Sequence, residues 1–479
     1  MSNSNLIQAL KQAGLEAGDI VLLHSSLLSL GELACSPELV IDAFLQVLGK
    51  DGTLAVPAFG SLGILTETVK QHPQAVFSDA PLGTVAAIGP HAQQLCAGHW
   101  HCESAHGEGS PYLKIAELGG LICLLGVDQD RNTSLHSAEA LLKLPYLSDK
   151  SASVCDPEGK TRSKTWKHYP GPHRDFIGLD RHFRQAGIMQ TTRIGNAALR
   201  LIKSQEMLQL CQELGTADPA FVLCDNPACA DCVTQRAALF RQRIASQESF
   251  KLAASARLAG HYVPEIIDKL KDCGIDFVEL DYLQGRSVIN LSPEKLQAAV
   301  AEFRQAGIQI SALRLPCLPA DFKRLLEQLQ AAAVERLILP LPHNAETLAM
   351  LAEHNIAFDL CNSIENSAEF RRLFAPLAAK FSCQAVFNPR NFVLANEHPF
   401  LHSWRIGRFI KSIGQLDVAD LTWDQRPARL ARGNAEIKEL ISILRCHHFS
   451  GWLTLGGGAL YPGSLQQAQS DFLTLLDNM

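Results

Sequence analysis

A histidine and a carboxylate three residues apart, His136 and Glu139, are the residues of this chain best suited to proton transfer. At this spacing two side chains share one face of a helix. An imidazole titrates near neutral pH and can take a proton from a substrate, while a carboxylate beside it orients the ring and stabilises its cation. The same pattern is also common as a simple surface ion pair, so the pair alone leaves both interpretations open.

The residues before the pair predict a strand that leads into the helix carrying it. The apolar run LICLLGV ends in the polar turn DQDRNTS. Sheets of α/β proteins place ligands at such turns, outside the carboxyl ends of buried strands. Thr133 or Ser134 can cap the following helix. Asp128 and Asp130 in the same turn are substitutes if the Glu139 side chain faces outward.

The composition is that of a globular chain of 479 residues, with 47% hydrophobic residues and a net charge of −6. One hydrophobic core stops growing well below this length, so we expect two domains. Basic residues occur as scattered pairs, which argues against a nucleic-acid or anionic-membrane partner. No apolar run reaches the roughly 18 residues of a membrane span, and the polar start lacks a signal-peptide core. We therefore expect a cytoplasmic protein with reduced cysteines.

The sequence pattern changes near residue 232. Residues 1–232 mix strands and helices, 233–249 predict a linker helix, and 250–479 alternate regularly between apolar strands and amphipathic helices. Eight such strands predict an α/β fold of the closed parallel (β/α)8 barrel type. They lie in residues 251–257, 276–282, 308–315, 336–342, 356–361, 383–388, 414–420 and 451–457.

Several ordered motifs in the first half resemble those of the aminoglycoside N(3)-acetyltransferase family. They are GDIVLLHSSLLSLG (18–31), GKDGTLAVPAF (49–59), AAIGP (86–90) and TSLHSAE (133–139). The resemblance covers approximately residues 5–232. It implies an α/β/α sandwich that transfers an acetyl or other acyl group from acyl-CoA, normally acetyl-CoA, to an amine. Residues 77–90 lack the Arg and His-Pro of the family pattern, which leaves the acceptor open between an aminoglycoside and another amino sugar.

In this interpretation His136 is the general base and Glu139 orients it. The candidate contacts to acetyl-CoA are polar residues beside predicted strand ends and helix starts: His24, Ser25, Ser26, Ser110 and Thr133. The alternative for the triplet His24 to Ser26 is a helix cap beside a core histidine. No metal is assigned to this site, and association of several copies is left open.

The second half resembles the xylose-isomerase-like barrels through DFVEL (276–280) and the closing GWLTL (451–455). The metal-ligand positions of those barrels are largely replaced, and glycines 456–458 follow the last strand, as a phosphate site or a tight turn. Because hard divalent ions need several oxygen ligands, we predict a barrel without metal chemistry. Polar groups at the predicted strand ends favour a sugar pocket: Glu279, Asp281, Arg314, His343, Asp359, Asn388, Arg390 and Asp420. Two alternatives to acyl transfer stay open, a sugar isomerase or epimerase in the barrel and a non-catalytic carbohydrate-binding protein.

Three cysteines, Cys224, Cys229 and Cys232, form a C-x4-C-x2-C pattern. Three thiolates at this spacing can hold zinc with a fourth ligand such as Cys211. The alternative is a loop that merely contains small thiols, and the sequence leaves the choice open.

Overall fold

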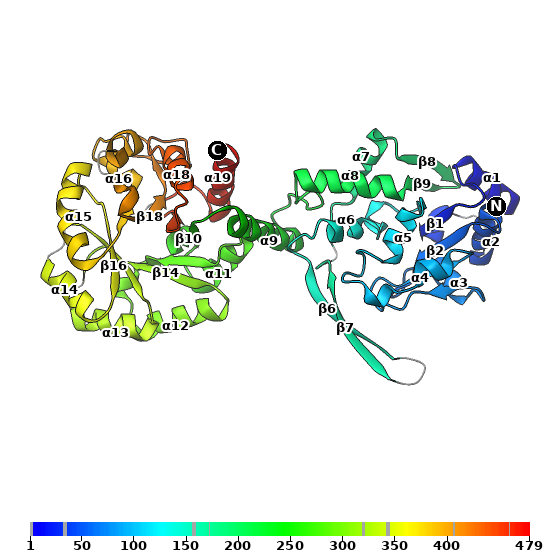
Figure 1. Cartoon of the computed structure of the whole chain (residues 1–479), viewed down its shortest axis with the longest axis horizontal. Coiled ribbons are helices and arrows are strands. Elements are labelled where there is room, and N and C mark those ends of the chain that lie inside the picture. The colour runs from blue at the N-terminus through cyan, green and yellow to red at the C-terminus, as the bar shows by residue number, and fades with distance from the viewer. Residues whose placement is uncertain are drawn as a thin grey trace. The chain divides into compact units, whose positions relative to one another are not determined.

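The computed structural model describes residues 3–31, 36–155, 160–171, 173–318, 321–341, 345–405, 408–458 and 460–479. The chain divides into two compact units, Met1–Gln235 and Arg236–Met479, and the division falls within helix α9 (Ala230–Gln247) (Figure 1). Within the described ranges, no helix is both long and apolar enough to cross a bilayer.

The N-terminal unit contains a seven-stranded mixed sheet. Its strands are β1 (Ile20–Ser25), β2 (Thr53–Pro57), β3 (Val76–Phe77), β4 (Val85–Ile88), β5 (Leu121–Leu125), β8 (Met189–Ile194) and β9 (Ala197–Lys203). The order is β3-β4-β2-β1-β5-β9-β8. The central strands β2, β1 and β5 are parallel, and β4 and β9 run antiparallel to them on either side.

Helices cover both faces of this sheet. They are α1 (Asn3–Gln12), α2 (Pro37–Leu48), α3 (Ile64–Gln71), α4 (Ala92–Cys96), α5 (Pro111–Glu117), α6 (Leu135–Leu141), α7 (Asp180–Gln185) and α8 (Ser204–Ala217). Side chains alternate across a strand, so Val21 and Leu23 of β1 join the core formed with α1 and α2. Leu22 joins the core formed with α4 and α5 on the other face. The predicted α/β/α sandwich is confirmed.

A long β-hairpin, β6 (Ser148–Cys155) and β7 (Thr161–His168), projects from the N-terminal unit (Figure 1). Lys164, midway along β7, attaches the hairpin to the rest of the unit by donating to the carbonyls of Trp100 and Cys102 at 2.8 and 2.9 Å. Trp166, fully buried, packs edge-to-face on Trp100. The chain that leaves β7 then passes beside the candidate site.

The C-terminal unit is a closed barrel of eight parallel strands, as predicted. The strands are β10 (Lys251–Ser255), β11 (Phe277–Leu280), β14 (Gln309–Arg314), β15 (Arg336–Pro340), β16 (Ala357–Cys361), β17 (Ala385–Phe387), β18 (Ile413–Val418) and β21 (Trp452–Leu455). The main helices between them are α11 (Val263–Asp272), α12 (Pro293–Gln305), α13 (Phe322–Ala332), α14 (Ala345–Glu353), α15 (Ser367–Phe381), α16 (Pro389–Leu394), α18 (Ile437–Cys446) and α19 (Leu465–Asp477). Leu337 and Leu339 of β15 pack in the core between the strands and the helices. Ile338 belongs to a separate small cluster. Because side chains alternate across a strand, this cluster lies inside the barrel.

Candidate active site

The pair His136 and Glu139 lies on α6, which follows β5 through a short polar turn. The Nδ1 atom of His136 is 2.6 Å from Oε2 of Glu139. A carboxylate accepts hydrogen bonds, so Nδ1 carries the proton and donates it, and Nε2 of the neutral ring keeps its lone pair. The His136 side chain is 11% exposed, and no hydrogen bond to its Nε2 is found among the residues that the structure describes. The pair is therefore held internally, with one basic nitrogen left for a substrate.

The second oxygen of Glu139 is held by two further side chains. Oε1 accepts hydrogen bonds from Nε of Arg174 at 2.6 Å and from the Tyr146 hydroxyl at 2.9 Å. Both Glu139 and Arg174 are almost completely buried, with side-chain exposures of 0% and 1%. Arg174 also donates through Nη1 to the carbonyl oxygens of Pro170 and His173. A carboxylate paired and bonded on both oxygens can be buried as a charge, because its partners replace its hydration.

The surroundings set the charge states of the pair. Burial lowers the pKa of the His136 imidazole; the hydrogen bond and charge of Glu139 oppose this, and the net direction is downward. Burial by itself raises the pKa of Glu139, but His136 and Arg174 outweigh burial and hold that pKa below its ordinary value. At neutral pH the site thus contains a neutral imidazole beside an ionised carboxylate, which is the combination a general base requires.

Aromatic and imidazole rings enclose His136. Tyr169 stacks on it with ring centroids 3.4 Å apart and an interplanar angle of 3°, and Phe176 meets it edge-on at 5.0 Å. The ring centroid of His106 is 5.5 Å from that of His136 and 5.6 Å from that of His168. Burial lowers the pKa of His106 well below its ordinary value and that of His168 to about 4, so both rings are neutral. The neighbouring imidazole rings therefore add no positive charge beside the base at neutral pH.

Most of these partners could not be assigned a role from the sequence. Arg174 is 35 residues from Glu139 along the chain, and no local pattern links them. His106 and His168 belong to a group of histidines to which the sequence assigns no role, and Tyr169 is not singled out by any motif. The chain leaving β7 positions His168 and Tyr169, whereas His106 follows a segment, 103–105, that pairs with Lys167 of β7.

One local expectation around the pair, a side-chain cap from Ser134, is wrong, and the condition for using Asp128 or Asp130 is not met. Ser134 occupies the N-cap position of α6, but its backbone is already helical and no described cap bond forms to its side chain. Asp128 does not approach His136; it caps the short 3₁₀ turn after β5 and pairs with Arg200 at 2.8 Å. Asp130 pairs with Arg131. Glu139 faces inward, so no substitute is needed.

The five candidate contacts to acetyl-CoA lie in different settings. Ser25 ends β1 opposite Leu125, the end of β5, so it lies at the carboxyl edge of the sheet. Ser26 follows it and donates its backbone N–H to the Leu125 carbonyl. His24 is buried, and burial lowers its pKa to about 3, so it is a neutral core histidine.

The other two candidates precede helices. Ser110 is fully buried and caps α5, accepting a hydrogen bond from the Leu113 N–H. Thr133 is half-buried before α6, and its carbonyl accepts the backbone N–H of His136. Ser25, Ser26 and Thr133 thus belong to the edge from which α6 begins, while Ser110 has a structural role as a cap.

The carboxyl ends of the barrel strands surround a guanidinium group that is paired with two buried carboxylates. Arg314, at the end of β14, pairs with Glu279 at 2.6 Å and with Asp417 at 2.7 Å. Asn388 donates to the other oxygen of Asp417 at 3.0 Å, and Gln415 donates to both carboxylates. Because the carboxylates are already neutralised by a fixed cation, they are not free to ligate a metal ion.

The glycines after β21 close over this network in a turn. A Cβ on residue 457 would come within 2.4 Å of Asp417 Oδ1, and one on Gly458 within 2.9 Å of Arg314 Nη1. The backbone of Gly458 also has a φ of +59°, which favours glycine. The triple glycine therefore lets the turn approach the Arg314 network closely.

The remaining polar groups of the barrel do not gather into one sugar pocket. Asp420 accepts three backbone N–H groups and holds a loop, and Asp281 accepts from two backbone N–H groups and the Ser255 hydroxyl.

Asp359 lies in the middle of β16 and pairs with Arg336, the first residue of β15. A cavity of about 730 Å³ opens at this amino-terminal end of the strands, opposite to the usual catalytic face. Arg390 is partly exposed, and His343 lies outside the described residues.

Comparison with known proteins concerns the N-terminal half of the chain. A family model described as aminoglycoside 3-N-acetyltransferase matches residues 22–61 and 59–215. Aminoglycoside N(3)-acetyltransferase IV of Salmonella sp is 28% identical over 221 residues, which cover 43% of this chain and 84% of that relative. Type VIII of Streptomyces fradiae is 30% identical over 181 residues, 30% of this chain and 63% of that relative. A solved structure of aminoglycoside acetyltransferase AAC(3)-IVa without ligand aligns with a TM-score of 0.46 at 27% identity, over 49% of this chain and 96% of that one.

Proposed function

We propose that the N-terminal unit transfers an acetyl group from acetyl-CoA to an amine of an aminoglycoside or a similar amino sugar, because this unit is similar to the aminoglycoside 3-N-acetyltransferases. The observation that carries the proposal is the buried His136–Glu139 pair with one basic nitrogen unoccupied within the described part of the chain. The resemblance of the barrel to xylose-isomerase-like proteins stays a prediction, and the Arg314 network argues against an isomerase there.

In the proposed reaction Nε2 of His136 removes a proton from the acceptor amine. The amine nitrogen attacks the thioester carbonyl carbon, a C–N bond forms, and the C–S bond breaks. The proton held by His136 then passes to the leaving thiolate, so that the products are the N-acetylated acceptor and CoA. Glu139 stabilises the transient imidazolium, while Arg174 and Tyr146 keep the carboxylate in place.

A cavity lined in part by the segment that follows Arg174 contains carboxylates and guanidinium groups. It measures about 430 Å³, and its lining includes Asp128, Asp175 and Asp180 together with Arg181 and Arg184. Asp128 and Asp180 are paired with Arg200, whereas Asp175 is exposed and accepts only a backbone N–H among its described contacts. Its neighbour along the chain, Phe176, packs against the His136 ring. Asp175 is thus the carboxylate best placed to attract an ammonium group near the base.

We test the proposal by measuring thiol release from acetyl-CoA by the purified full chain with a panel of aminoglycosides and monomeric amino sugars. We expect acceptor-dependent release together with an N-acetylated product in the mass spectrum. The absence of release with every acceptor, while the protein is folded, contradicts the proposal.

Replacing Asp175 by asparagine tests the acceptor site. We expect the KM for a cationic acceptor to rise roughly two- to five-fold, the range of exposed ion pairs, and the KM for acetyl-CoA to stay unchanged. The effect should shrink at high salt, because exposed charges are screened. Equal changes in both KM values contradict this role of Asp175.

The acidic side of the pH–rate profile tests the pair. Because burial lowers the pKa of His136, we expect the acid limb of kcat/KM below about pH 6.5, the ordinary histidine value. Glu139→Gln removes a charge that raises this pKa, so the limb should move to still lower pH while kcat falls by about 10²-fold.

Tyr146→Phe is the matched control, because it removes a bond to the same carboxylate but keeps the charge. Its acid limb should stay in place or move slightly to higher pH. A shift to higher pH in Glu139→Gln contradicts the assignment of the limb to His136.

A further inference from the structure

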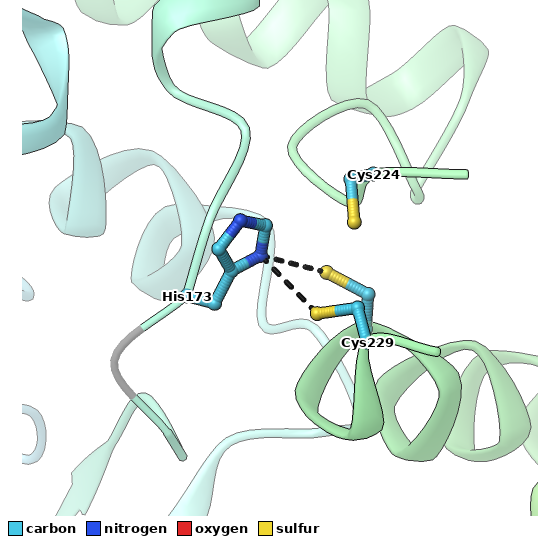
Figure 2. A group of neighbouring side chains, drawn as sticks. His173, Cys224 and Cys229 are labelled. Carbon is cyan, nitrogen blue, oxygen red and sulfur yellow. Dashed lines mark hydrogen bonds between the residues drawn. The ribbon is translucent and has the colours of Figure 1, made fainter. Parts of the chain in front are cut away.

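Four potential metal ligands from separate parts of the N-terminal unit come together beside the start of α9. They are His173, Cys224, Cys229 and Cys232, and their ligand atoms all lie within 4.8 Å of one another. Figure 2 shows the His173 ring facing the sulfur atoms, and its Nδ1 is 3.4 Å from Sγ of both Cys229 and Cys232. The fourth ligand suggested by the sequence, Cys211, is buried in α8 and is not in this group.

The two nitrogen–sulfur distances in this group match those of a tetrahedral zinc site. Zinc–sulfur bonds of about 2.3 Å and zinc–nitrogen bonds of about 2.0–2.1 Å place neighbouring nitrogen and sulfur ligands about 3.5 Å apart. The two nitrogen–sulfur distances are 3.4 Å. Three cysteines and one histidine are a ligand set that zinc adopts in closed structural sites, and soft thiolates disfavour magnesium and calcium.

The approach of His173 to the cysteines is fixed by the backbone around it. The His173 N–H donates to Oδ2 of Asp231 at 3.2 Å, and Asp231 lies in the first turn of α9 between two of the cysteines. Gly171 packs so closely on the Asp231 carboxylate that a Cβ there would come within 2.3 Å of it. Gln235 donates to the Pro170 carbonyl at 3.2 Å. The two segments are therefore docked by contacts other than those of the ligands.

We propose that His173, Cys224, Cys229 and Cys232 bind one zinc ion as a closed structural site. When bound, the ion clamps the start of α9 to the segment 169–176, which supplies Tyr169 and Arg174 to the candidate active site. Arg174 follows the ligand directly and donates to the His173 carbonyl at 2.6 Å while bonding Glu139. The zinc ligands are thus positioning residues. Their effect on acyl transfer rests on the proposed function, but zinc binding itself does not.

Metal analysis of the purified full chain tests the site. We expect about one zinc per chain after removal of loosely bound metal. Cys229→Ser should reduce the zinc content to background, whereas Cys229→His should retain it, because imidazole can replace a thiolate ligand. Cys446→Ser, an exposed thiol in the barrel unit, is the control and should keep the full zinc content.

A second readout does not depend on activity. Removal of zinc should make the three clustered thiols react with a thiol reagent and should lower the unfolding temperature of the N-terminal unit, since metal binding contributes to folding. A chain that contains no zinc when produced with zinc in the medium, or a disulfide between two of these cysteines, overturns the proposal. Zinc at full occupancy without acetyl-CoA turnover overturns the proposed function and leaves the zinc site intact.

Discussion

Replacing His136 by alanine is expected to lower kcat for acetyl transfer by about 10²- to 10⁴-fold, the usual contribution of a general base. Its Nε2 is the basic nitrogen left over by the hydrogen bond to Glu139. Because the side chain stacks on Tyr169, some loss of stability should accompany the substitution. The KM for acetyl-CoA should change little, because the proton is moved in the chemical step rather than on binding.

The controls for this experiment separate chemistry from folding. His136→Gln keeps an N–H donor for Glu139 but has no titrating nitrogen, so it should preserve the fold and still lose activity. His101→Ala, at an exposed histidine of the same unit, should retain activity. Acetyl transfer by His136→Ala at the wild-type rate contradicts the proposed role of His136 as the general base.

Replacing Arg314 by methionine is expected to cost the barrel about 3–5 kcal/mol of stability at pH 8, as for other buried ion pairs that lose one partner. The substitution leaves two carboxylates, Glu279 and Asp417, without their cation, and both side chains are completely buried. Calorimetry of the full chain measures the effect, and the transition of the N-terminal unit should stay unchanged.

The stability loss caused by Arg314→Met should change with pH in a definite direction. Burial raises the pKa of Asp417 to about 6, above its value of about 3.9 in the unfolded chain. Between these two pH values the folded chain holds a proton on Asp417 that the unfolded chain has lost. The contribution of Asp417 to the stability of the folded state therefore falls as pH rises from about 3.9 to about 6. Without Arg314 this pKa should rise further, and the deficit of the variant should shrink as pH falls below 6. A triple variant that also carries Glu279→Gln and Asp417→Asn should recover much of the loss. An Arg314→Met barrel as stable as the wild type contradicts the role of the guanidinium.

The local part of the candidate site was predictable because helix geometry is short-range. Two residues three apart on a helix meet whatever surrounds them, and the apolar strand with its polar turn gives the position of that helix. The same holds for the barrel, since eight apolar segments with helices between them have one good way to bury both faces of each strand. The barrel was therefore predictable from the residue pattern, whereas the sandwich was predicted from the resemblance of the first half to a known family.

Tertiary structure alone decided the partners of these residues. Arg174 reaches Glu139 across 35 residues, and His173 reaches Cys229 and Cys232 across 56 and 59, because the hairpin returns the chain to α6 and α9. Arg314 reaches Asp417 across 103 residues because barrel closure brings strand interiors together. The spacing of apolar residues in a sequence indicates which face of a helix or strand is buried. It carries no information on which side chain from a distant part of the chain will contact that face. Whether Glu139 is a surface charge or a buried partner of the base was settled by the path of the chain.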